Sequence, residues 1–291
     1  MKKLLTKTIG ASLNTLAYIA PEKTARIGFE LFCRPFRLSI NAKQRAFLSS
    51  AAHEVFDHKG DSIQTYRWGN GNKKILLLHG WQSHTYRWKV YVENLSRDYS
   101  VYALDAPGHG LSGGKLLNVP LYSEIIAEQI KRIGELHAII THSLGGFATF
   151  YSFYRNPNLP VSKLITLASP GEAQEFFDFY ADTLRLTKKT TELVVGHFEK
   201  TFQKNPGFFS APAFAKALKI PGLIIHDEDD AETPFYHAER IHRAWKNSKL
   251  IKTKGYGHNL KAPDVVNTVL HFVNDPLPLQ FTSQMAASNQ R

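Results

Sequence analysis

The stretch from residue 136 to residue 146, Leu136-His137-Ala138-Ile139-Ile140-Thr141-His142-Ser143-Leu144-Gly145-Gly146, decides the fold. It predicts a short apolar strand, then a serine among small residues, then a helix. Such a turn holds the Ser143 hydroxyl clear of the backbone and directs the next N–H at whatever the oxygen attacks. Gly145 stands at the second glycine of the pattern G-x-S-x-G, whereas Thr141 replaces the first. Thr141 adds a branched side chain where the turn is tightest, so either the turn tolerates it or the chemistry is slow.

Strands and helices alternate on both sides of this turn. Residues 74–79 form a continuous apolar run, typical of a strand that is covered on both faces. Residues 53–59 and 62–68 alternate polar and apolar side chains, which predicts an antiparallel hairpin. Further strands are predicted at 100–104, 163–167, 222–226 and 249–254, and helices at about 85–97, 121–134, 236–245 and 262–272. We therefore expect an α/β fold with a mostly parallel eight-stranded sheet, helices on both faces, and ligands beyond the carboxyl ends of the strands.

One segment interrupts the alternation. Between Pro170 and Pro221 the pattern is helical and rich in aromatic residues. A connection of this length inside an alternating fold indicates a functional insertion, which we interpret as a helical cap above the strand ends. Phe176 and Phe177 are candidates for lining an apolar substrate pocket. The alternative is that these rings only attach the cap to the core.

The charge of the chain is concentrated at one end. Residues 1–50 hold nine basic and two acidic side chains, so they carry +7 of the net charge of +11. An anionic membrane surface or an acidic partner therefore fits better than nucleic acid. Cys33 is the only cysteine, so no internal disulfide forms, which suits the cytoplasm. No oligomeric state follows from these features.

The first twenty residues have three interpretations. Six apolar or small residues share one helical face: Leu4, Leu5, Ile9, Leu13, Leu16 and Ala20. That face predicts a helix packed on the domain or lying peripherally on a membrane. A cleaved leader is the third interpretation, although Lys7, Asn14 and Thr15 interrupt the apolar stretch. No apolar run reaches the roughly 18 residues of a transmembrane helix. The predicted divisions are a basic helical extension (1–50), a core (51–170 and 220–275), a cap (171–219) and a flexible tail (276–291).

A serine nucleophile needs a base, and the base needs an acid that orients it. Two loops that follow strands downstream of Ser143 offer these groups. The first contains Asp227, Asp229 and Asp230, and the second contains His258. The order serine, aspartate, histidine is the one that accompanies this type of turn.

Five motifs in order give the chain a family resemblance. They are His79-Gly80-Trp81, Asp105-Ala106-Pro107-Gly108-His109-Gly110, His142-Ser143-Leu144-Gly145-Gly146, Asp230-Ala231-Glu232-Thr233-Pro234 and Gly257-His258. Over residues 50–275 the chain resembles the α/β-hydrolase superfamily, in the group of bacterial esterase-like serine hydrolases with a helical cap after the sixth strand.

The resemblance implies a role for each matching residue. Ser143 is the nucleophile, His258 the general base and Asp230 the acid, because Asp230 has the family's spacing from Pro234. The backbone N–H groups of Trp81 and Leu144 form the oxyanion hole. Gln82, which follows that loop, is a candidate for contact with substrate.

The chain departs from the family pattern at the acid loop. Asp227 stands at a usual glycine and Thr233 at a usual valine, but no catalytic group is lost. A metal site from His226, Asp227 and Asp229 is not expected, because neighbours in an extended segment point to opposite sides. Neither a metal nor a cofactor is predicted.

The expected function is cleavage of carboxylic esters with small to medium apolar acyl groups through an acyl-enzyme. Thioesters, lactones and C–C bonds remain alternatives for the same triad. A membrane-surface lipase and a binding protein without activity are further alternatives, because a fold does not fix a function.

Overall fold

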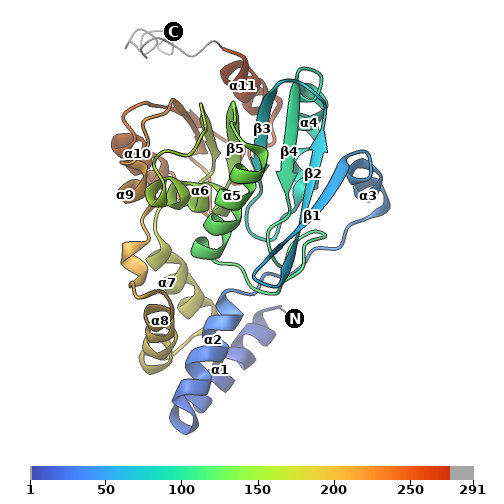
Figure 1. Cartoon of the computed structure of the whole chain (residues 1–291). Coiled ribbons are helices and arrows are strands. Elements are labelled where there is room, and N and C mark those ends of the chain that lie inside the picture. Colours follow the sequence, from blue (N-terminus) through green and yellow to red (C-terminus); the bar gives the residue numbers. More distant parts are fainter. Residues whose placement is uncertain (1, 276–291) are drawn as a thin grey trace.

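Eight strands form one sheet in the computed structural model, which describes residues 2–275 (Figure 1). They are β1 Ala52–His58, β2 Asp61–Trp68, β3 Lys73–Leu78, β4 Tyr99–Leu104, β5 Ala138–His142, β6 Leu164–Leu167, β7 Gly222–Asp227 and β8 Ser248–Thr253. Their order is β1-β2-β4-β3-β5-β6-β7-β8. β2 pairs antiparallel with β1 and β4, and every other pairing is parallel. The predicted fold class is confirmed, whereas the predicted tail (276–291) lies outside the described residues.

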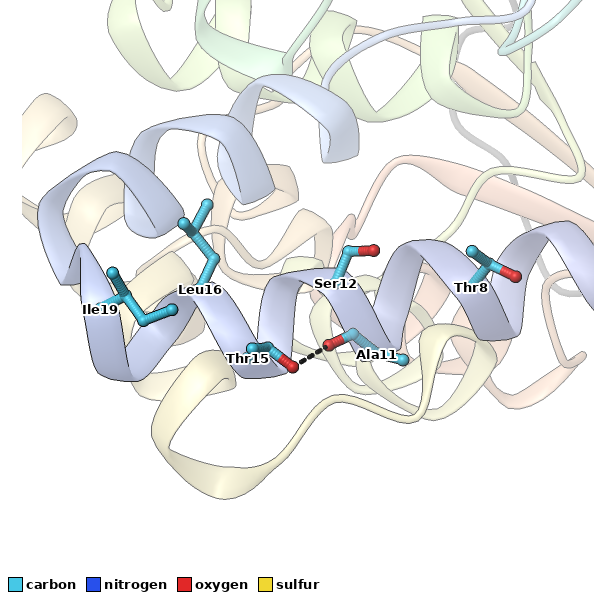
Figure 2. Close-up of a pocket in the computed structure, with 6 residues that line it drawn as sticks. All are labelled: Thr8, Ala11, Ser12, Thr15, Leu16 and Ile19. Carbon is cyan, nitrogen blue, oxygen red and sulfur yellow. Dashed lines mark hydrogen bonds between the residues drawn. The ribbon is translucent and has the colours of Figure 1, made fainter.

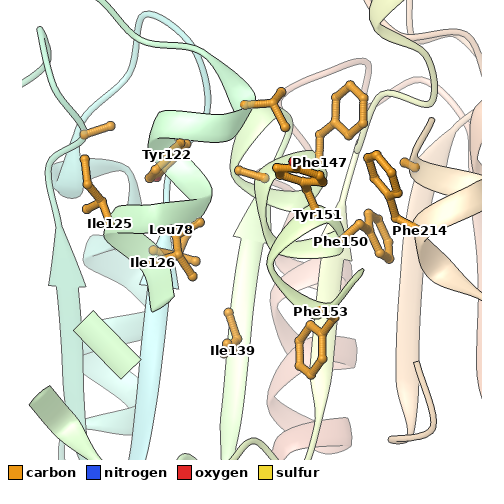
Figure 3. Packing of buried hydrophobic residues seen from close by; sticks show 14 of the residues in the cluster. Leu78, Tyr122, Ile125, Ile126, Ile139, Phe147, Phe150, Tyr151, Phe153 and Phe214 are labelled. Carbon is orange, nitrogen blue, oxygen red and sulfur yellow. The ribbon is translucent and has the colours of Figure 1, made fainter. Parts of the chain in front are cut away.

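Side chains of the central strands point alternately to the two faces of the sheet, and each face has its own hydrophobic core. Leu76 and Leu78 of β3 point into one core, which α5 (Val119–Ile133) and α6 (Leu144–Arg155) cover together with α9 (Ala211–Ala215) and α10 (Tyr236–Ala244). Figure 3 shows this core, with Leu78 and Ile139 below Tyr122 and Phe147. Ile75 and Leu77 point to the other face.

Three helices and a short turn pack on that second face. They are α3 (Ala42–Leu48), α4 (Lys89–Leu95), α11 (Pro263–Asn274) and the 3₁₀ turn η1 (Thr85–Trp88). The helix expected over 85–97 thus divides into η1 and α4. The Thr85 N–H donates to Asp105 Oδ1 at 2.8 Å, which ties η1 to the loop after β4.

The insertion between β6 and β7 is helical, as predicted. It contains α7 (Ala173–Leu184), α8 (Lys188–Phe202) and the 3₁₀ turn η2 (Pro206–Phe208) before α9. The N-terminal helices α1 (Lys2–Ile19) and α2 (Pro21–Phe32) pack against α7 and α8 rather than against the sheet (Figure 1). Phe32 stacks on Phe177 with ring centroids 4.2 Å apart, and Phe29 meets Phe198 edge-on at 6.0 Å. The division into extension, core and cap stays a prediction, and these contacts join the extension to the cap.

α1 packs through small residues. Gly10, Leu13 and Ala17 are buried, and a Cβ on Gly10 would lie only 1.7 Å from the Leu184 carbonyl oxygen. Asn14 fixes the register, because its amide donates to the Arg185 carbonyl at 3.0 Å and accepts from the Thr187 N–H at 2.9 Å.

The opposite side of α1 borders a shallow hollow of about 400 Å³ (Figure 2). Its lining residues are Thr8, Ala11, Ser12, Thr15, Leu16 and Ile19. Leu16 thus borders this outer side of α1, although the predicted apolar face included it. Within residues 2–275, no helix combines the length and apolarity needed to cross a membrane.

Candidate active site

Ser143 occupies a strained turn between β5 and α6. Its φ of 50° and ψ of −123° are rare for a residue with a side chain, and such a conformation costs of the order of 1–3 kcal/mol. Glycines allow the close packing around it. A Cβ on Gly80 would lie 2.7 Å from the Ser143 Cβ, and one on Gly145 would lie 2.6 Å from the Leu78 carbonyl oxygen. The loop after β3 therefore lies directly against the half-buried serine.

Thr141 is accommodated beneath this turn. The side chain is fully buried, and its hydroxyl donates to the Ile165 carbonyl of β6 at 3.1 Å. A Cβ on Gly146 would lie 3.1 Å from Thr141 Oγ1 and 2.8 Å from Ser169 Oγ. The missing side chain at Gly146 thus leaves the room that Thr141 takes.

Asp230 and His258 meet beyond the ends of β7 and β8. Asp230 Oδ2 lies 2.8 Å from His258 Nδ1. Its other oxygen, Oδ1, accepts the backbone N–H groups of Glu232 and Thr233, both at 2.9 Å. The Thr233 hydroxyl donates to Oδ2 at 2.8 Å. Of the three candidate acids, Asp230 is the one that contacts His258.

A second histidine adjoins the same carboxylate. His226 Nε2 lies 2.7 Å from the Thr233 carbonyl oxygen, so it carries the proton, and it is 3.3 Å from Asp230 Oδ2. Burial alone would raise the pKa of Asp230, but hydrogen bonds from His226, His258 and the Thr233 backbone hold it far below its ordinary value. Asp230 is therefore ionised at neutral pH.

Asp227 organises the loop that carries His258. Its Oδ2 accepts the Thr253 hydroxyl at 2.7 Å and the Tyr256 N–H at 3.0 Å. Although burial would raise the pKa of Asp227, these hydrogen bonds keep it below the ordinary value. The acidic cluster is thus explained by loop structure, and among the described residues no group of three or more His, Cys, Asp or Glu side chains is placed to hold a metal ion.

His142 brings the serine turn next to the base loop. Its Nε2–H donates to the His258 carbonyl at 2.8 Å, and the two rings lie 4.8 Å apart. His258 Nε2 lies 3.8 Å from the carboxylate of the exposed Glu232. Within the described part of the chain, Ser143 Oγ and His258 Nε2 form no direct hydrogen bond, and such contacts often tighten only when substrate binds.

Two histidines hold the loop after β3. His109 Nε2 accepts the Gln82 N–H at 2.9 Å, and His79 Nε2 accepts the Ala106 N–H at 3.0 Å. The Gln82 N–H is thus occupied, and the role of the neighbouring Trp81 N–H as an oxyanion donor stays a prediction. Leu144 begins α6, so its N–H has no partner within the helix.

The remaining candidates are Gln82, Phe176 and Phe177. Gln82 has an exposed side chain and a φ of 47°. Phe177 is 2% exposed and packs against Phe32 and Phe198, and Phe176 is partly buried beside the same cluster. The packing accounts for Phe177, and substrate contact by Gln82 and Phe176 stays a prediction.

Sequence reasoning missed the roles of His109, His226 and Thr233. His109 stands in the Gly-rich motif after the fourth strand with no signal for its contact with Gln82, and the sequence suggests His226 only as a metal ligand. Thr233 was noted as a departure from the family pattern, and that hydroxyl in place of valine was the available signal.

The chain is similar to known hydrolases. A model of the alpha/beta hydrolase family matches residues 75–269. The chain is 27% identical over 244 residues to a bifunctional esterase/perhydrolase from Acinetobacter calcoaceticus, covering 66% of this chain and 88% of that protein. It is 31% identical over 106 residues to the pimeloyl-(acyl-carrier protein) methyl ester esterase of Salmonella newport (strain SL254), covering 36% of this chain and 40% of that protein.

A solved structure described as a membrane phospholipase A has the same fold. It superposes with a TM-score of 0.61 at 17% identity and covers 95% of this chain and 100% of that one. The family model spans β3 to α11, including the serine turn and both loops that meet at Asp230. The chain therefore belongs to the alpha/beta hydrolase family and is a hydrolase.

Proposed function

We propose that this hydrolase cleaves carboxylic esters through Ser143, His258 and Asp230. The observation that carries the proposal is the 2.8 Å contact between Asp230 Oδ2 and His258 Nδ1, beside a strained serine turn. A carboxylate on Nδ1 fixes the tautomer that leaves Nε2 free to accept a proton. His142 holds the backbone of His258 next to the residue that precedes the nucleophile.

The reaction would proceed in two halves. Ser143 Oγ attacks the ester carbon while its proton passes to His258 Nε2, and the carbonyl oxygen becomes an oxyanion. The C–O bond to the alcohol then breaks, the leaving oxygen takes the proton from His258, and the acyl group stays on Ser143. Water attacks this acyl-enzyme with His258 as the base, which releases the acid and restores the serine.

The backbone N–H groups of Trp81 and Leu144 would bind the oxyanion. Two observations support this assignment: Leu144 is the first residue of α6, directly after the strained Ser143, and Gly80 packs closely against Ser143. Loss of one such donor typically costs about 3–4 kcal/mol of transition-state stabilisation.

The proposed substrates are esters with small to medium apolar acyl groups. The aromatic cap supports an apolar acyl part, and the relatives named as esterases support the ester bond. Thioesters, lactones and C–C bonds are alternatives with the same chemistry. A protein that binds without catalysis is the alternative from another class.

A p-nitrophenyl ester series separates these alternatives. We expect a burst of p-nitrophenol, a preference for particular acyl lengths, and labelling by a fluorophosphonate. Ser143→Ala should lose burst and label, while Ser96→Ala at the end of α4 keeps both. Labelling that persists in Ser143→Ala would contradict Ser143 as the nucleophile. If the wild-type protein binds these esters without turnover, the binding alternative is supported.

Peripheral membrane contact through the N-terminal arm is a separate proposal. Tyr18 and Ile19, at the end of α1, are 68% and 75% exposed, and Lys189 Nζ lies 3.9 Å from the centroid of the Tyr18 ring. Exposed apolar side chains beside lysines suit an anionic lipid surface. A cytoplasmic location also stays a proposal, supported by Cys33, the single cysteine, which is buried and has its thiol pKa raised by burial to about 12.

A further inference from the structure

Among residues 2–275, Thr233 is the one residue whose hydroxyl hydrogen-bonds with both the acid and the base of the proposed triad. The residue is buried, three positions after Asp230, where the family pattern has a valine. Its Oγ1 lies 2.8 Å from Asp230 Oδ2 and 3.2 Å from His258 Nδ1. The same oxygen is 3.4 Å from His226 Nε2 and 3.4 Å from the Ala168 carbonyl oxygen.

The protons around Asp230 Oδ2 can be assigned from the neighbouring acceptors. A hydroxyl has one proton, and the carboxylate is its shortest and only charged acceptor, so Thr233 donates to Oδ2. His226 gives its Nε2 proton mainly to the Thr233 carbonyl at 2.7 Å. Oδ2 therefore receives two full hydrogen bonds, one from Thr233 and one from His258 Nδ1.

We propose that the Thr233 hydroxyl is a positioning residue that competes with His258 for Asp230 Oδ2 and so sets the pH range over which His258 works as a base. The inference rests on the proposed triad. A carboxylate oxygen that already accepts a hydroxyl proton offers less negative charge to an imidazolium. A valine at position 233 would leave Asp230 Oδ2 to His258 without this competing hydroxyl.

Other charged or titratable groups face this pair and stay the same when Thr233 is changed. Glu232 lies near His258 Nε2, and His226 lies near Asp230. His237 acts on Asp230 electrostatically. His142 contacts His258 by ring and hydrogen bond, and Arg87 donates to the Asn259 carbonyl at 2.6 Å. A change in the pH profile of a Thr233 variant therefore reports on the hydroxyl.

The test compares Thr233→Val with Thr233→Ser in the full-length enzyme. Valine keeps the shape and removes the hydroxyl, whereas serine keeps the hydroxyl and removes a methyl group. We expect the acidic limb of kcat/KM for p-nitrophenyl butyrate to move up by about half a pH unit in Thr233→Val and to stay in place in Thr233→Ser. Thr233→Ala supplies the same loss of the hydroxyl if the valine variant folds poorly.

Two results would overturn the inference. One is an active Thr233→Val enzyme whose profile coincides with the wild type, and the other is an equal shift in Thr233→Ser, which would point to packing. Ser143→Ala, measured in parallel, keeps the two proposals apart. If it is inactive while the valine profile is unshifted, the serine mechanism stands and only the role of Thr233 falls.

Discussion

Two buried histidines act as fixed neutral acceptors around the serine. Burial lowers the pKa of His109 to about 3, so its ring is uncharged over the whole working range. Its Nδ1 proton goes to the Pro107 carbonyl at 2.9 Å, which leaves Nε2 to accept from Gln82. Burial likewise lowers the pKa of His79, although Asp105 opposes this. The loop that carries Trp81 is thus held by rings that do not titrate with the base.

Replacing His109 tests this support. In His109→Leu the Gln82 N–H loses its acceptor, so the adjacent Trp81 N–H is no longer held in place. We expect kcat to fall roughly 10-fold with little change in KM, because only part of one oxyanion donor is lost. The measurement is steady-state ester hydrolysis. His109→Gln, whose side chain keeps an acceptor oxygen, should retain more activity, and an unchanged kcat in the leucine variant would contradict the idea.

The sequence predicts the triad residues of the site but not the hydrogen bonds that support them. Ser143, Asp230 and His258 were named from motifs, because each motif carries its own local geometry. The hydrogen bond from Gln82 to His109 joins two loops 27 positions apart, and motif spacing does not encode it. Of the four contacts of the Thr233 hydroxyl, those with Ala168 and His258 likewise arise only when the ends of β6, β7 and β8 come together.

The cap helices owe their packing to the N-terminal helices. Phe177 of α7 stacks on Phe32 of α2 and meets Phe198 of α8 edge-on at 5.2 Å. Helical periodicity predicted an apolar face on each segment, but a periodic face does not name its partner. The sequence therefore indicated the cap and the extension separately, and their association appears only in the structure.

A pair of phenylalanines on α7 tests this packing. Phe177→Ala removes a buried ring, and we expect the free energy of unfolding to fall by about 3 kcal/mol. Phe179→Ala, on the same helix but 70% exposed, should change it by less than about 0.5 kcal/mol. Urea denaturation followed by fluorescence gives both values. Similar values for the two variants would show that the stacked cluster does not stabilise the cap.

The molecule as a whole was predictable because its motifs stand in a fixed order. Continuous apolar strands and the serine turn gave the parallel sheet, and the strand positions agree with the structure to within about two residues. The sequence does not decide whether the basic N-terminal arm packs on the domain or on a membrane, because an apolar helical face suits either surface. The structure buries Leu13 of that face, together with Ala17, which the predicted face did not include, and leaves Tyr18 and Ile19 exposed.

Vesicle flotation tests the membrane proposal, and point variants suit it better than truncation. Removing the arm would uncover Phe177 and Phe198, and the exposed cap would bind lipid by itself. We expect wild-type protein to float with phosphatidylglycerol vesicles at low salt and not with phosphatidylcholine vesicles. The Tyr18→Ser, Ile19→Ser variant should float less, with Val55→Ser, on the exposed β1 strand, as the control. Equal flotation of the two would end the proposal.

Because the N-terminal helices pack on the cap, α2 is synthesised well before the helix that it packs against. Phe29 leaves the ribosome about 170 residues before Phe198, its partner in α8, and at ~5–20 residues per second the wait is roughly 8–30 s. During that interval the apolar side of α2 has no native partner, and closing so long a loop slows the docking step. The nascent chain therefore carries an apolar helix without its cap partners until α8 has been synthesised.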